Sequence, residues 1–171
     1  MPITGVHHTG IIVKDLDKSI YFYHDVLGLE FQNEPSPWFA GEDLERGVGV
    51  PGGTLRQVCL VAGNDIVELV EYGNTPTEIE PQPQNRIGAM HVALRVDDAE
   101  KTKAELEAKG IVFLSEANTV DEGVLAGWRW VYFLDPDGIT VELVEVAYFH
   151  AEERRRGIEE YLANRPAPAS R

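Results

Sequence analysis

The chain has 171 residues, with 15 Lys and Arg against 29 Asp and Glu, which gives a formal net charge of −14. This excess of carboxylates repels phosphate backbones, so we expect no nucleic-acid partner. A hydrophobic fraction of 43% is typical of a folded domain. No apolar run approaches a membrane span, the N-terminus shows no secretory signal, and Cys59 is the single cysteine. The sequence therefore predicts a cytoplasmic protein without a membrane segment or a disulfide.

The first half of the chain predicts a βαβββ unit. Runs rich in β-branched residues predict strands, and an apolar spacing of three and four from Leu16 predicts a helix that Asp15 or Asp17 caps and Gly28 ends. The strands are expected at 6–13, 29–32, 55–61 and 65–72. Between the second and third strands, residues 33–54 are rich in proline and glycine. Trp38 and Phe39 in this segment either cover a pocket or pin the loop to the core, and the sequence leaves both roles open.

The same pattern restarts in the second half. Asp97 or Asp98 caps a helix that continues through Lys109, and Asp135-Pro136-Asp137-Gly138 has strong turn chemistry. The strands are expected at 90–96, 111–114, 128–134 and 139–146, and a charged helix at 152–163. The predicted organisation is a first module at 5–73, a linker at 74–87, a second module at 88–147, and a C-terminal helix with a frayed tail at 148–171.

A repeated pentapeptide supports this duplication. Val-Glu-Leu-Val-Glu occurs at 67–71 and again at 141–145, and each copy follows a histidine in a matching apolar run. His8 and His91 are 83 positions apart, whereas Glu68 and Glu142 are 74 apart, so the first module holds extra residues in its loop. Each half therefore supplies one imidazole and one carboxylate.

These four residues form a candidate metal site. A single histidine in a strand is more often an ordinary polar residue, and a single glutamate at a strand end is usually solvated. A carboxylate among Val, Leu and Ile is costly unless it is paired or metal-bound, and here the placement recurs in both halves. We expect His8, Glu68, His91 and Glu142 to bind a divalent ion (Zn, Ni, Co, Mn or Fe) and to leave two octahedral positions for water or substrate.

Alternation along the strands separates these residues from their neighbours. Glu68 shares a face with Val70, and Glu142 is placed equivalently. His7 is expected on the face opposite to His8, so it is not expected to be a ligand. Glu71 and Glu145 close the two pentapeptides and are expected to face solvent.

Several motifs are together typical of one superfamily. They are His7-His8-Thr9-Gly10-Ile11, Asp15-Leu16-Asp17-Lys18-Ser19, Phe22-Tyr23 with Leu27-Gly28-Leu29, and Asp135-Pro136-Asp137-Gly138 followed by Glu142. With these motifs the sequence resembles the vicinal oxygen chelate superfamily, which includes glyoxalases, bleomycin-resistance proteins and extradiol dioxygenases. The resemblance implies an α+β fold in which two tandem βαβββ modules form a half-open, metal-containing barrel. It also places the family's metal ligands on the four residues above and implies a homodimer.

The resemblance narrows the activity less than the fold. Two histidines and two glutamates are similar to the ligands of bacterial nickel-type glyoxalase I, but Tyr72-Gly73-Asn74 stands where that enzyme carries Asn-Trp-Gly. The phrases Asp-Leu-Asp-Lys-Ser and Glu-Leu-Val-Glu resemble methylmalonyl-CoA epimerase, which commonly has glutamine where this chain has Glu68. Extradiol dioxygenases use two histidines and one glutamate.

We therefore predict a metal-dependent enzyme that epimerises or isomerises a small carbonyl or acyl-thioester substrate. Glu142 is the expected base and Glu68 the opposite acid or base, because an inversion needs proton transfer on two faces. The alternatives are a glyoxalase I-like lyase, an extradiol-type dioxygenase and a ligand-sequestering protein of the bleomycin-resistance type. The net charge of −14 leaves little cationic surface for binding CoA. The candidates for the pocket wall are Trp38, Phe39, Trp128, Arg129 and Trp130.

Overall fold

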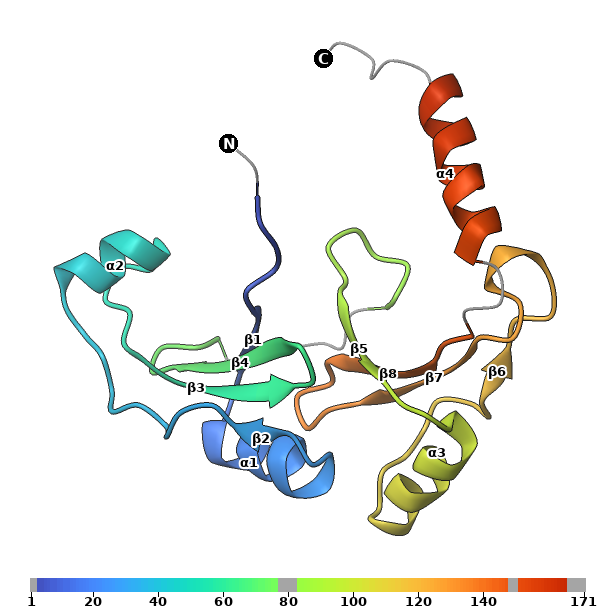
Figure 1. The fold of residues 1–171 in the computed structure, drawn as a ribbon. Helices are drawn as coiled ribbons and strands as arrows, with labels where there is room; N and C mark the ends of the chain where they lie inside the picture. Colours follow the sequence, from blue (N-terminus) through green and yellow to red (C-terminus); the bar gives the residue numbers. More distant parts are fainter. Residues whose placement is uncertain (1–2, 77–82, 148–150, 166–171) are drawn as a thin grey trace.

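A computed structural model describes residues 3–76, 83–147 and 151–165. It contains two four-stranded mixed sheets, which lie side by side (Figure 1). The first sheet has the order β1-β4-β3-β2 and the second has the order β5-β8-β7-β6. The first-sheet strands are β1 (Thr9–Val13), β2 (Glu30–Phe31), β3 (Leu55–Ala62) and β4 (Asp65–Tyr72). The second-sheet strands are β5 (His91–Arg95), β6 (Asn118–Thr119), β7 (Arg129–Leu134) and β8 (Thr140–Glu145).

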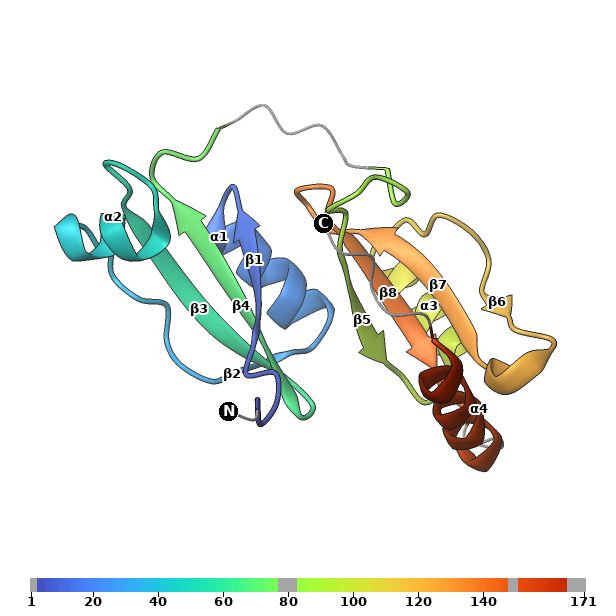
Figure 2. The same cartoon turned by 90° about the horizontal axis from the view of Figure 1, so that it is seen from above.

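The predicted duplication and the α+β class are confirmed. In each half the first strand pairs in parallel with the last, and the remaining strand pairs are antiparallel. The edge strands β1 and β5 face each other across the seam between the sheets (Figure 2). Within the described ranges no strand pairing joins the two sheets, so they are not closed into a barrel.

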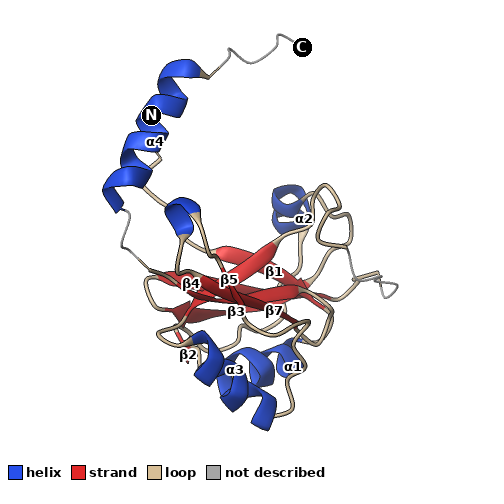
Figure 3. Cartoon of the chain, turned by 90° about the vertical axis from the view of Figure 1, so that its right-hand side faces the viewer, coloured by secondary structure: helices blue, strands red, loops and turns tan. Residues whose placement is uncertain are grey.

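The helices lie on two sides of the sheets. α1 (Leu16–Ile20), which continues as the π-helix η1 (Tyr21–Val26), and α3 (Ala99–Ala108) cover one face (Figure 3). α2 (Glu42–Val48) and α4 (Ala151–Asn164) lie on the opposite side. None of the helices in the described ranges has the length and apolarity that a membrane span requires.

The covering helices begin and end as their sequence predicts. The side chains of Asp15 and Asp98 accept the backbone N–H groups of Lys18 and Lys101, which caps the two helices. The glycine expected to end the first helix, Gly28, has φ of 84°, a backbone conformation that side-chain-bearing residues rarely adopt.

Three expectations about local structure are wrong. The strand expected at 6–13 begins only at Thr9, which leaves His8 immediately before β1. The strand expected at 111–114 is reduced to a single bridge between Phe113 and Phe133. α2 lies within the proline- and glycine-rich segment 33–54, where no helix was expected, and a 3₁₀-helix, η2 (Gly123–Leu125), lies between β6 and β7. The helix expected at 152–163 corresponds to α4, whereas the tail from Pro166 lies outside the described residues.

The two modules share one core. Leu16, Leu60 and Leu69 of the first half and Val131 and Leu143 of the second belong to the same buried cluster. Burial of this apolar surface is the main term that stabilises such a fold.

The turn between β7 and β8 locks the modules together. The hydroxyl of Tyr23, which is fully buried, donates to Asp135 Oδ2 at 3.1 Å. The backbone N–H of Lys14 donates to Asp137 Oδ2 at 2.7 Å. The Asp-Pro-Asp-Gly motif therefore carries polar contacts between modules as well as a turn.

The segment that contains Trp38 and Phe39 is pinned along the edge of β3. Phe39 exchanges two backbone hydrogen bonds with Leu55, and Ser36 N–H donates to the carbonyl of Gln57. The guanidinium of Arg56 stacks on the Trp38 ring, 5.4 Å from its centroid. These contacts hold the segment against β3, while the rings of Trp38 and Phe39 remain about half exposed.

Candidate metal site

The structure brings each predicted histidine beside its glutamate. His8 Nε2 lies 3.3 Å from Glu68 Oε2, and His91 Nε2 lies 3.1 Å from Glu142 Oε2. His8 lies immediately before β1 and His91 is the first residue of β5, and each glutamate lies on the last strand of its module, which pairs in parallel with the first strand. The two pairs are called the first and second half-sites below.

The separation of the atoms fits ligation of a common ion. Two donor atoms that each lie about 2.1 Å from one ion, at right angles, are about 3 Å apart. Both observed separations are close to this value, and the imidazole and carboxylate donors suit Zn, Ni, Co, Mn or Fe(II). Each half-site can therefore supply two adjacent ligands.

The half-sites lie on the side of the sheets that α1 and α3 leave uncovered. Val67 and Leu69 of β4 are buried under the helices, so Glu68 between them points to the uncovered side. Val141 and Leu143 place Glu142 in the same way. Among the described residues no group of three or more His, Cys, Asp and Glu side chains is arranged around one point, so the half-sites remain two separate pairs.

His7 contacts the His8 ring at the nitrogen that does not face Glu68. Its Nδ1 lies 2.8 Å from Nδ1 of His8, a distance at which one ring donates a hydrogen bond to the other. This contact leaves Nε2 of His8 directed at Glu68. A hydrogen bond to the remote ring nitrogen is the usual way in which a ligating histidine is oriented.

The two half-sites differ in the residues that pair with their glutamates on the neighbouring strands. Glu68 lies between Gly10 on β1 and Cys59 on β3, whereas Glu142 lies between Ala93 on β5 and Tyr132 on β7. Small residues, Gly10 and Ala93, stand beside the carboxylates on the parallel strand. On the antiparallel strand, a thiol in the first half-site corresponds to a phenol ring in the second.

The second half-site is the more desolvated of the two. The Glu142 side chain is 12% exposed, against 25% for Glu68. Burial raises the pKa of Glu142, and the nearby His91 opposes this effect in part. Burial also raises the pKa of Tyr132, with a smaller contribution from the charge of Glu142. Glu142 is thus a stronger proton acceptor, once ionised, than an ordinary surface carboxylate.

Tyr132 was missed by the sequence analysis. Its ring centroid lies 5.3 Å from that of His91, and Trp130, which was named as a pocket-wall candidate, lies 5.1 Å beyond it. The alternation of β7 with the buried Val131 and Phe133 was the signal that could have placed Tyr132 beside Glu142.

Two other pocket-wall candidates lie elsewhere. Arg129 points to the helix side, where its guanidinium lies 3.9 Å from Glu145 and 3.7 Å from Glu100. The indole N–H of Trp128 donates to the carbonyl of Ala147 at 2.8 Å, which ties this residue to the end of the second module.

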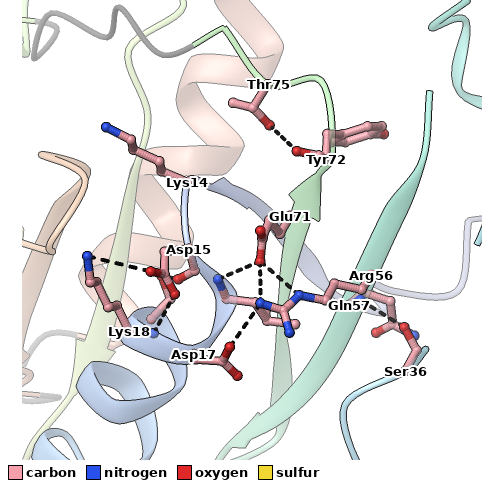
Figure 4. A network of polar contacts seen from close by, with 12 residues as sticks. Lys14, Asp15, Asp17, Lys18, Ser36, Arg56, Gln57, Glu71, Tyr72 and Thr75 are labelled. Carbon is pink, nitrogen blue, oxygen red and sulfur yellow. Dashed lines mark hydrogen bonds and ion pairs between the residues drawn. The ribbon is translucent and has the colours of Figure 1, made fainter. Parts of the chain in front are cut away.

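The expectation that Glu71 and Glu145 face solvent is wrong. Glu71 Oε2 accepts the backbone N–H of Leu16 at 2.9 Å and the Nε–H of Arg56 at 2.9 Å (Figure 4). Glu145 Oε2 accepts the backbone N–H of Ala99 at 3.0 Å. The last residue of each pentapeptide therefore caps the helix of its own module, because it lies on the opposite strand face from the half-site.

A cavity of about 430 Å³ lies in the seam between the modules. It is lined by the β3–β4 turn and Leu27–Leu29 on one side and by β5 and α3 on the other. Its walls include Thr9 and Ala93, which are neighbours of the half-sites, but none of the four candidate ligands. The cavity is therefore a gap between modules and not the candidate site itself.

Comparison with known proteins agrees with this architecture. The profile of the glyoxalase/bleomycin resistance protein/dioxygenase superfamily matches residues 5–143. The chain belongs to this superfamily. Of solved structures, a glyoxalase family protein from Bacillus cereus superposes with a TM-score of 0.70 at 22% identity, covering 85% of this chain and 96% of that protein. This likeness supports the fold alone.

Relatives in the superfamily carry the names of two kinds of enzyme. A 2-epi-5-epi-valiolone epimerase from Actinomyces sp is 30% identical over 83% of this chain and 79% of that protein. The mitochondrial methylmalonyl-CoA epimerase of Bos taurus is 32% identical over 81% of this chain and 72% of that protein. A lactoylglutathione lyase from Schizosaccharomyces pombe is 31% identical over 81% of this chain, which spans about half of that lyase (46%).

Proposed function

We propose that the protein is a divalent-metal-dependent enzyme that moves a proton on the carbon next to a carbonyl group, and so epimerises or isomerises its substrate. The main support is the duplicated half-site, in which an imidazole nitrogen and a carboxylate oxygen lie 3.3 Å and 3.1 Å apart. The names of the two epimerase relatives point in the same direction.

His8, Glu68, His91 and Glu142 would hold the ion. A divalent ion supplies positive charge that stabilises the negative charge developing on a substrate oxygen when the neighbouring proton leaves. Glu142 is the proposed base, since it is the more desolvated carboxylate. Glu68 is the proposed proton donor on the opposite face, because an inversion requires that the proton return from the side it did not leave.

A complete site requires that the half-sites approach each other. We infer that the cavity in the seam between the modules leaves space for this approach. Alternatively, the first half-site of one chain pairs with the second half-site of another copy, as the predicted homodimer would allow. Mixing His8→Ala and His91→Ala variants separates these cases, because activity returns in the mixture only if the half-sites of different chains combine.

A glyoxalase I-like lyase is the second candidate, favoured by the relationship to a lactoylglutathione lyase. The same proton transfer serves both reactions, so the substrate distinguishes them. Incubation in deuterated water, followed by NMR, separates the two. Exchange with inversion at the acidic carbon supports an epimerase, whereas isomerisation of a thiol adduct supports a lyase.

The Glu142→Gln variant tests the proposed base. Gln keeps the shape of the side chain but cannot accept the proton, so we expect exchange to fall by about 100-fold or more. The matched control is Glu145→Gln, on the same strand but the opposite face, which should retain exchange. If Glu142→Gln exchanges the proton at the wild-type rate, the assignment is wrong.

A further inference from the structure

An aromatic surface begins at the second half-site and runs away from it along β7. The rings of Tyr132 and His91 meet edge to face with centroids 5.3 Å apart, and Trp130 lies 5.1 Å from Tyr132. Both side chains alternate with the buried Val131 and Phe133, so they share the uncovered face with Glu142. Both are half-buried, which leaves part of each ring accessible.

The duplication provides an internal comparison for this surface. Tyr132 faces Glu142 across the ladder, and Trp130 faces Val144. At the matching positions of the first module, Cys59 faces Glu68 and Gln57 faces Val70. The histidine and glutamate occur in both halves, whereas the two rings occur in one. The rings are therefore not required for a His–Glu pair to form, and they are available to contact something else.

Polar groups border the aromatic surface on the same face. Glu142 stands beside Tyr132, and Arg95 lies two strands from Trp130 in the row Arg95–Val144–Trp130. Arg95 is exposed. An apolar ring surface with a carboxylate and a guanidinium at its border suits a ligand that has an apolar face and a hydroxylated rim.

The position of Tyr132 limits which part of a ligand can pack there. Because Tyr132 contacts His91, the packing group must lie next to the oxygen atoms that approach the half-site. In an acyl-CoA, the groups beside the reacting carbon are small and the aromatic base lies at the far end of a long chain. The net charge of −14 is also unfavourable for several phosphates. A ring that itself bears the carbonyl fits both constraints.

We propose that the substrate of this site is an uncharged, ring-shaped polyhydroxy ketone whose C–H face packs against Tyr132 and Trp130. This inference rests on the function proposed above, in which the half-sites act on the carbon next to a carbonyl group. Tyr132 and Trp130 determine specificity by this contact and take no part in the proton transfer. An open-chain hydroxyketone lacks the ring face, so it should bind more weakly.

Saturation-transfer NMR on the zinc-reconstituted protein tests the contact directly. The probes are a pentahydroxycyclohexanone, dihydroxyacetone as the open-chain hydroxyketone, and methylmalonyl-CoA as the charged thioester. Saturating the aromatic protons should transfer signal to the ring C–H groups of the first probe. Replacing both rings by the residues of the first module, Trp130→Gln with Tyr132→Cys, should weaken its binding about tenfold. The control Gln57→Ala, at the first-module position that matches Trp130, should bind it as the wild type does.

Three results would overturn the proposal: no transfer to the ring probe, equal binding by the double ring variant, or tighter binding of dihydroxyacetone or methylmalonyl-CoA. The transfer measurement does not require turnover, so it is separate from the test of the proposed function. Ring binding that depends on Trp130 and Tyr132, together with unchanged exchange in Glu142→Gln, would refute only the proposed base. Exchange of a thioester substrate that both ring substitutions leave unaffected would refute only the ring substrate.

Discussion

Glu71→Ala is expected to destabilise the protein strongly, although Glu71 lies only three residues from Glu68 on the same strand. Glu71 Oε2 accepts the N–H of Leu16 at 2.9 Å and forms an ion pair with Arg56, whose Nη2 lies 2.7 Å away. Loss of a helix-capping interaction costs about 1 kcal/mol. Loss of the charge-assisted bonds to a guanidinium costs about 1.5–3 kcal/mol.

The two contributions together give about 3 kcal/mol, which for a chain of this length lowers Tm by roughly 6–12 °C. Thermal unfolding followed by circular dichroism, with a chelator present to remove bound metal, measures the change. Glu68→Ala is the matched comparison and should shift Tm by only a few degrees under the same conditions, because Glu68 is on the half-site face.

The effects of the two substitutions on metal affinity should be the reverse of their effects on Tm. Glu71→Ala should keep its metal as long as it remains folded, whereas Glu68→Ala should lose affinity. If Glu71→Ala unfolds at the wild-type temperature, or if Glu68→Ala is the more destabilised of the two without metal, the assignment of strand faces is wrong.

Two further substitutions test the contacts of Asp135 between the modules and the space around the first half-site. Burial raises the pKa of Asp135, so the folded protein keeps this proton to higher pH than the unfolded chain, and stability falls as pH rises from about 4 through the folded pKa. Asp135→Asn removes this component, so urea titrations should show the variant gaining stability relative to the wild type as pH rises from about 4. A difference that stays constant with pH would contradict this. Gly10→Ala should unfold at or slightly above the wild-type Tm, because the added Cβ would lie 3.6 Å from Glu68 Oε2 and Ala93 occupies the matching position. A fall of more than about 1 kcal/mol in the free energy of unfolding would show that the space beside Gly10 does not accommodate a methyl group.

Much of the fold follows from local patterns in the sequence. The β4 strand was predicted with its observed ends, because the turn Ala62-Gly63-Asn64 precedes Asp65 and Gly73 follows Tyr72. The duplication was visible because the pentapeptide preserves both strand faces. Each half-site pair was expected from the strand alternation of Glu68 and Glu142. The ladders pair these residues with Gly10 and Ala93, and each histidine lies two residues earlier on the same face.

Other features depend on contacts that a local pattern does not contain. The capping role of Glu71 requires that α1 pass over the end of β4, which only the tertiary packing determines. Tyr132 lies beside Glu142 because the β7–β8 turn sets the register of the pair. α2 lacks buried residues, so no apolar periodicity marks it in the sequence.

Metal stoichiometry and affinity, measured by elemental analysis and calorimetry on the reconstituted protein, show whether the two half-sites share one ion. We expect one divalent ion per chain, with affinity reduced by similar factors of about 100 or more in His8→Ala and His91→Ala, since both half-sites supply ligands to one ion. The absence of a stoichiometric ion would refute the shared metal site. So would wild-type affinity in either variant, because one half-site would then bind metal without the other.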